Sequence, residues 1–253
     1  MNEALPGWNQ SSIHKNDAPD NSLGTYEVKY FPRSMLRQRV KEVCASCNNR
    51  WMSGLESAVK PQLIRFMLRM PSILGGEQLR LFVRWAVKTH MMRTEFDRAG
   101  FPYPKSQRDV IANDGRVPSE WTIWVGATQH NGVTHRNWSF SVGLSESEVV
   151  NISQTTLVIG GLVIIVTYVD HDGFRAAISE WIDGMSHTLG LGLAKLSGES
   201  VMLVHQGGPI IHPSVTHDLS GAARAVMGYI LEEELPDIPN LSLRQSVTGL
   251  SDS

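Results

Sequence analysis

The feature that most constrains the fold is a change of hydrophobic periodicity between residues 100 and 118. Before this stretch, apolar residues recur at helical intervals, most clearly over 76–96. After it, short apolar or alternating runs predict strands at 121–128, 137–142, 155–159, 162–168 and 201–205. This order predicts an α+β fold, with a helical N-terminal part and a C-terminal part built around an antiparallel sheet.

Four regions follow from the same patterns. Residues 1–25 and 241–253 are rich in small polar residues without periodicity, so we expect an irregular lead and a flexible tail. Between them we expect a basic helical region, 26–108, which opens with a short strand at 26–31, and a mixed, mainly β region, 109–240, which contains a late helix at 222–235. The hairpin between 155 and 168 is expected to turn on Gly160 and Gly161.

Charge is distributed unevenly, although the formal net charge is only −2. Residues 26–108 contain 16 Lys or Arg against 6 Asp or Glu, whereas the remainder contains 7 against 19. A basic segment joined to an acidic one is typical of a nucleic-acid-binding part with a separate scaffold. The alternative is that these charges lie on solvated helix faces and balance each other in space.

Cys44 and Cys47 are the only cysteines, and two residues separate them. This spacing is typical of a metal knuckle or a redox pair rather than of secreted disulfides, which favours a reducing compartment and hence the cytoplasm. The chain shows no secretory signal, and its longest apolar run, 157–169, is too short to span a membrane. A structural zinc needs four ligands, so His14, another histidine or a second subunit would have to contribute, or the site is empty.

A helix is expected directly after the cysteines. Ser53 and Glu56 have the spacing of a capping box, and Leu55 and Val59 follow at helical intervals. Pro61 either kinks this helix or begins the next one.

Residues 44–56 resemble the second half of a zinc-supported HNH nuclease motif found in bacterial HNH-endonuclease-like proteins, Cys-x-x-Cys-Asn-x-Gly-Trp-Met-Ser-x-Leu-Glu. Arg50 replaces the usual glycine of this motif. The matching residues are Cys44, Cys47, Asn48, Trp51, Met52, Ser53, Leu55 and Glu56. A weaker likeness continues at Lys60, Pro61, Trp85, Lys88 and the Gly160–Gly161 turn.

The resemblance implies metal-dependent phosphodiester hydrolysis. It implies a structural zinc at Cys44 and Cys47, and Mg²⁺ or Mn²⁺ at a catalytic site that includes Asn48 and Asn49. In such a site a histidine deprotonates water while the metal stabilises charge on the phosphate. Neither asparagine can serve as that base.

The family's histidine precedes the motif, in a Glu-His-x-x-Pro-x-Trp segment. Pro6 and Trp8 fit the end of that segment, which would place the histidine at Glu3. The family's first cysteine pair would then fall before the first residue, so we expect a truncated motif and impaired catalysis. His14 is the nearest substitute for the base.

A nucleic acid, most simply DNA, is the expected partner. Phosphate contacts need Lys or Arg side chains without a particular order, and six such residues flank the knuckle. They are Lys29, Arg33, Arg37, Arg39, Lys41 and Arg50. The alternatives are a noncatalytic nucleic-acid-binding or assembly protein and a purely structural role, and the oligomeric state is open.

Overall fold

The computed structural model describes residues 10–15, 26–31, 48–97, 103–128, 133–144, 149–188, 192–196, 201–203 and 244–250. Its helical elements are η2 (Asn48–Met52), α2 (Ser53–Met67), α3 (Gly76–Asp97), α4 (Lys105–Asp109), η3 (Val110–Asp114) and α5 (Asp172–Thr188). Its strands are β1 (Gln10–Lys15), β2 (Tyr26–Phe31), β3 (Ser72–Leu74), β4 (Trp121–Ala127), β5 (Val133–Gly143), β6 (Val149–Ile159), β7 (Leu162–Val169), β8 (Ala194–Lys195), β9 (Val201–Leu203) and β10 (Arg244–Leu250).

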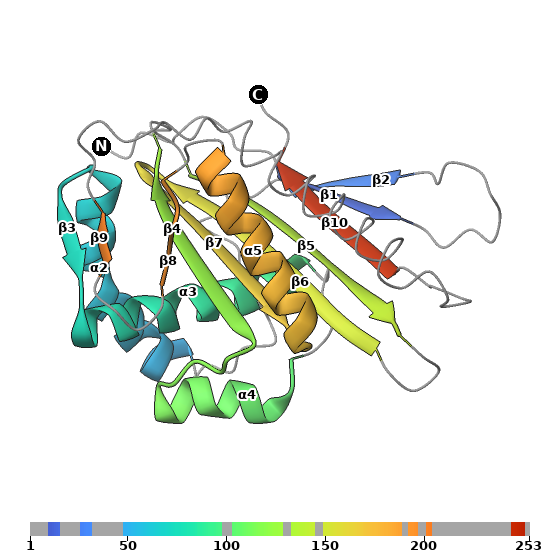
Figure 1. The fold of residues 1–253 in the computed structure, drawn as a ribbon, viewed down its shortest axis with the longest axis horizontal. Helices are drawn as coiled ribbons and strands as arrows, with labels where there is room; N and C mark the ends of the chain where they lie inside the picture. The colour runs from blue at the N-terminus through green and yellow to red at the C-terminus, as the bar shows by residue number, and fades with distance from the viewer. Residues whose placement is uncertain are drawn as a thin grey trace.

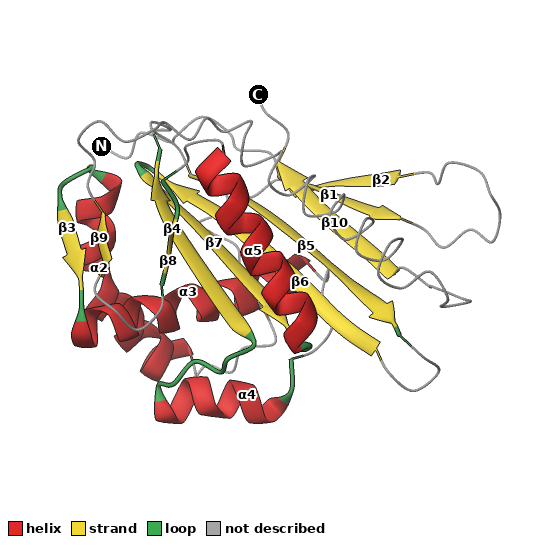
Figure 2. Cartoon of the chain, viewed as in Figure 1, coloured by secondary structure: helices red, strands yellow, loops and turns green. Residues whose placement is uncertain are grey.

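One antiparallel sheet dominates the fold, with strand order β2-β1-β10-β5-β6-β7-β4-β8. Strands β5, β6 and β7 are long, and each pairs with the next one along the chain. Strand β10, in contrast, inserts between β1 and β5. Helices α2 and α3 precede β4–β7, so the predicted α+β class is confirmed. The two-stranded sheet β3-β9 stands apart from the large sheet (Figures 1 and 2).

Helices cover both faces of the central strands. Ile164 and Val166 of β7 belong to the core shared with α2 and α3, whereas Val163 and Ile165 belong to the core shared with α5. Figure 1 shows α5 across one face of the sheet and α3 behind the other. Because both faces are covered, every residue of β7 is buried, which explains why six of its eight residues are aliphatic.

The first of these cores joins the two halves of the chain. Leu55 and Phe66 of α2 and Phe82 of α3 lie in one cluster with Ile123 of β4 and Ile164 of β7. The change of hydrophobic periodicity at 100–118 therefore separates a helical region from a mainly β region, and the two regions share one core.

Several expectations were wrong. The lead contains β1, which pairs with β2 and β10, and the expected flexible tail contains β10 itself. Helix α5, Asp172–Thr188, was not among the expected helices. The late helix expected at 222–235 lies outside the described residues.

Candidate functional site

The candidate site begins at the N-terminal end of the motif helix. Asn48 and Asn49 are the first two residues of η2, which leads directly into α2, and Arg50 beside them is exposed. Lys29 lies on strand β2. The other predicted site residues, Cys44, Cys47, Arg33, Arg37, Arg39 and Lys41, lie outside the described residues.

The expected capping box does not form. Because η2 precedes α2, Ser53 is already inside a helical run, and Met52 at the cap position has helical dihedrals and no side-chain cap bond. The Glu56 carboxylate instead pairs with Lys88 Nζ of α3. Lys88 is buried and Glu56 is half exposed, so this ion pair links an exposed side chain of α2 to a buried side chain of α3. Pro61 lies within the continuous helix rather than at the start of a new one.

Trp51 joins the motif to a third element. The guanidinium carbon of Arg84 lies 5.2 Å from the centroid of the Trp51 ring, within reach of a cation–π interaction. The same guanidinium donates from Nε to the carbonyl of Ile111 at 2.7 Å and from Nη2 to that of Ala112 at 2.6 Å. Arg84 therefore links η2, α3 and η3, and its burial lowers its pKa.

The C-terminal end of α2 rests on the β6–β7 turn. Gly160 has φ +55°, and a Cβ there would lie 3.1 Å from the Met67 carbonyl oxygen. A Cβ on Gly161 would lie 2.5 Å from Cγ of Arg69 and 3.0 Å from the Phe66 carbonyl oxygen. The Gly161 amide also donates to the Met67 carbonyl at 3.2 Å. Only glycine permits an approach this close.

The residues that carry the resemblance thus share a structural task. Trp51 and Glu56 attach the motif helix to α3, Lys88 receives one of those contacts, and the Gly160–Gly161 turn supports the far end. Lys88 and the Gly160–Gly161 turn are distant in sequence from the motif, and the likeness at these positions was weak. Only the three-dimensional structure shows that all of them hold the same helix in place.

A second cluster of reactive side chains surrounds His90 of α3. His90 is fully buried, with Nδ1 2.6 Å from Thr155 Oγ1 and Nε2 2.9 Å from Ser153 Oγ of β6. Thr155 donates its own proton to Asn137 Oδ1 at 2.7 Å, so it must accept from His90. The proton of the neutral ring therefore lies on Nδ1, and Nε2 is the acceptor.

Tyr103 completes this His90 cluster. Its hydroxyl donates to Thr94 Oγ1 at 2.9 Å and lies 2.9 Å from His90 Nε2 and 3.1 Å from Ser153 Oγ. Since the tyrosine proton is used on Thr94, Ser153 is the donor to Nε2. A serine that donates to a histidine resembles a nucleophile and its base. Ser153 and His90 are both 0% exposed, so no substrate reaches them and their role is structural.

Burial controls the protonation of this cluster. Desolvation lowers the pKa of His90 to about 3 and raises that of Tyr103. Both side chains are therefore neutral near pH 7. The sequence signalled His90 only as one more position on the inner face of α3, with no sign of its partners.

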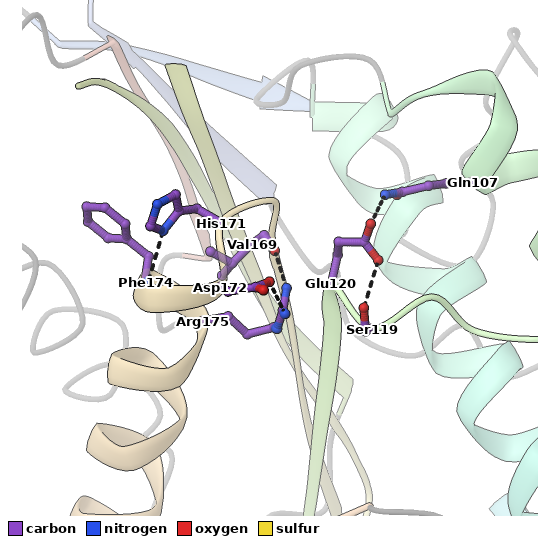
Figure 3. Close-up of polar contacts among 8 residues, drawn as sticks. All are labelled: Gln107, Ser119, Glu120, Val169, His171, Asp172, Phe174 and Arg175. Atoms are coloured by element: carbon purple, nitrogen blue, oxygen red, sulfur yellow. Dashed lines mark hydrogen bonds and ion pairs between the residues drawn. The ribbon is translucent and has the colours of Figure 1, made fainter. Parts of the chain in front are cut away.

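A third group of polar side chains lies where β4 begins and β7 ends (Figure 3). Gln107 Nε2 donates to Glu120 at 3.0 Å, and Arg175 pairs with Asp172. His171 Nδ1 accepts from the Phe174 amide at 3.4 Å and so caps α5. These contacts lie at the helix and strand ends, and Gln107 Oε1 is buried without a hydrogen-bond partner among the described residues.

The described part of the chain contains neither clustered metal donors nor a membrane-spanning helix. There, no group of three or more His, Cys, Asp and Glu side chains could hold a metal ion. No helix described is long and apolar enough to cross a membrane.

Comparison with known proteins adds no relative. No family model matches the chain, and no curated protein or solved structure matches it significantly.

Proposed function

We propose that this chain is an HNH-endonuclease-like protein that binds DNA through the N-terminal end of its motif helix and, as written, cleaves it poorly. The observation that carries the proposal is the attachment of that helix. Trp51, Glu56 and the contacts of Phe66 and Met67 fix it at both ends. A site that orients a phosphodiester needs such a rigid frame.

Charge supports a phosphate-facing role for this end of the helix. Within residues 26–108, Arg80, Lys88 and Lys105 have carboxylate partners among the described residues. Arg50 and Lys60, in contrast, are exposed, and neither forms an ion pair within the described residues. Part of the basic surplus is therefore balanced by neighbouring carboxylates, and two of the charges without such a partner among the described residues, Arg50 and Lys60, lie on η2 and α2.

Poor cleavage follows from the residues around the motif. Glu3 occupies the position where the resemblance places the histidine base. A general base typically contributes about 10²–10⁴-fold to a rate. Cys44 and Cys47 would supply two thiolates to a zinc that needs four ligands, and Asn48 and Asn49 would help to hold Mg²⁺ or Mn²⁺. The setting for reduced cysteines would be the cytoplasm.

Binding to duplex DNA, measured by fluorescence anisotropy at several salt concentrations, tests the first half of the proposal. We expect weak, strongly salt-dependent binding, because phosphate contacts release counterions. Arg50→Glu, and the pair Arg37→Glu with Arg39→Glu, should weaken it and reduce the salt slope by about 1 per lost contact. Arg80→Glu is the matched control, since Arg80 is exposed but already paired with Glu77. Equal effects of the Arg50 and Arg80 changes would refute the proposed surface.

Plasmid cleavage with Mg²⁺ or Mn²⁺ tests the second half. We expect little cleavage by the chain, and no difference after Asn48→Ala with Asn49→Ala. Robust cleavage that this double variant abolishes would show that another residue, with His14 the first suspect, supplies the base. DNA binding without any cleavage would favour the noncatalytic nucleic-acid-binding alternative. Zinc content before and after Cys44→Ser with Cys47→Ser tests the knuckle.

A further inference from the structure

An unusual apolar patch lies at the opposite end of α2 from the motif. Six large apolar side chains are exposed among the described residues, and five of them fall between residues 64 and 73. Leu68 and Ile73 are the most exposed, at 66% and 59%. The five are Ile64, Met67, Leu68, Met70 and Ile73, and we call them the α2–β3 patch. Single exposed apolar residues are ordinary, but a contiguous group marks an interaction site.

The patch is built on a fixed turn. Leu68, Arg69 and Met70 reverse the chain between α2 and β3, and their amides donate to the carbonyls of Ile64, Phe66 and Arg65 respectively, at 2.8–3.0 Å. Arg69 has φ +55°, a left-handed conformation that is uncommon for a residue with a Cβ. The aliphatic part of the Arg69 side chain lies against Gly161 of the β6–β7 turn. The apolar side chains are therefore presented on a rigid frame.

A depression of about 370 Å³ lies beside the patch. Its lining combines the apolar Ile73 with polar groups of α2, β3 and α3, namely Gln62, Arg65, Ser72 and Gln78, together with Pro71. Arg65 is held there, because its Nε donates to Ser72 Oγ at 3.0 Å and its Nη2 to the Pro71 carbonyl at 3.1 Å. Arg65 Nη1 forms no hydrogen bond within the described residues. Gln62 Oε1 is buried and has no hydrogen-bond partner among the described residues.

Charge identifies the partner. From 61 to 76 the chain contains two cations, Arg65 and Arg69, and no Asp or Glu. An apolar surface with a cationic rim complements an amphipathic segment with acidic flanks, whose carboxylate would reach Arg65 and whose apolar side chains would cover the patch. Exposed methionines such as Met67 and Met70 suit such a surface because they adapt their shape.

We propose that the α2–β3 patch and its depression bind an acidic, amphipathic helix of another protein. This binding surface is separate from the DNA-binding end of the motif helix. The protein would therefore bridge a nucleic acid and a second protein. If the chain does not bind DNA, the prediction that this surface binds a peptide is unaffected. If the surface does not bind the peptide, the DNA-binding prediction is unaffected.

The probe is a fluorescent 15-residue peptide with leucines at helical spacing and glutamates on both flanks, measured by anisotropy against the full chain. We expect binding, and at least a five-fold loss with Ile73→Ser or Arg65→Gln. The same peptide with glutamine for glutamate should bind at least five-fold more weakly. Arg80→Gln should bind as the parent does. Because Ile73 is largely exposed, Ile73→Ser should leave the thermal unfolding midpoint unchanged, which separates lost binding from misfolding.

Three outcomes would overturn the proposal. One is the absence of peptide binding up to about 1 mM, which corresponds to only about 4 kcal/mol of affinity. A second is self-association in sedimentation that Ile73→Ser abolishes, which would make a second copy the occupant. A third is co-sedimentation with anionic phospholipid vesicles that depends on Ile73, which would make the patch a membrane surface.

Discussion

At the scale of single residues, His90 has the largest measurable consequence. Its ring nitrogens are held by Ser153 and Thr155, and burial lowers its pKa from 6.5 to about 3. Between those two pH values the unfolded chain binds a proton that the folded protein rejects. The contribution to stability is complete above pH 6.5 and is lost as the pH falls toward 3.

We expect this residue alone to lower the free energy of unfolding by about 2 kcal/mol between pH 7 and pH 5, on the scale of 1.36 kcal/mol per pH unit. Urea denaturation across this range measures the slope. His90→Gln should be less stable at pH 7 but should lack this component of the pH dependence. His187→Gln, at an exposed position of α5, should keep it. An unchanged slope in His90→Gln would contradict the burial argument.

Lys88 and Glu56 provide a second test at this scale. The Lys88 side chain is 9% exposed and that of Glu56 is 57% exposed, so the removal of the carboxylate leaves a buried ammonium without its partner. We expect Glu56→Ala to lower the free energy of unfolding by about 1–3 kcal/mol, below the range for fully buried pairs.

A double-mutant cycle separates the pair from its background. Lys88→Met fits the apolar surroundings, and in combination with Glu56→Ala it should recover most of the loss. Additive effects of the two substitutions would mean that the pair contributes nothing.

At the scale of elements, the Gly160–Gly161 turn decides whether α2 can dock. We expect Gly161→Ala to destabilise the protein by about 1–3 kcal/mol, because a Cβ would overlap the stem of Arg69. Chemical denaturation followed by tryptophan fluorescence measures the effect. Gly184→Ala is the matched control: a Cβ there meets nothing within 4 Å, and alanine should favour the helix by up to about 1 kcal/mol. If Gly161→Ala and Gly184→Ala changed the free energy of unfolding equally, the close packing of α2 on the β6–β7 turn would be contradicted.

Elements with a strong local pattern could be predicted from the sequence. Helix α3 and the β6–β7 hairpin follow from periodicity and from two adjacent glycines. Helix α5 was missed because the turn signals at Asp172 and Gly173 hid its start and Gly184 interrupts its end. Strands β1 and β10 were missed because they are short and polar, and pairing with distant neighbours defines them.

The candidate site was less predictable for the same reason. The motif helix follows from local sequence, but Glu56 finds Lys88 32 residues away. His90 meets Ser153 and Thr155 at separations of 63 and 65 residues. No local pattern encodes such pairs. The capping box was a reasonable local solution for Glu56, and a tertiary ion pair replaced it.

At the scale of the whole molecule, the shared core predicts cooperative unfolding. Phe66, Phe82 and Ile164 belong to one cluster, so we expect far-UV circular dichroism and tryptophan fluorescence to give coincident transitions in urea. Residues 1–108 expressed alone should lack dispersed amide signals in NMR, because α3 would lose the sheet that covers it. Two separate transitions, or a folded fragment, would show that the boundary at 100–118 divides independent domains.

The position of β10 between β1 and β5 also sets an order of events on the ribosome. Strands β1 and β2 emerge first, yet the described sheet connects them to β5 only through residues 244–250. At about 5–20 residues per second, roughly ten to forty-five seconds separate synthesis of the hairpin from synthesis of the strand that receives it. From the completion of β5 at residue 143 until β10 is made, the edge of β5 that β10 covers is unpaired. Nascent chains of this protein are therefore expected to need a chaperone that shields strand edges, and slower translation should lengthen that dependence.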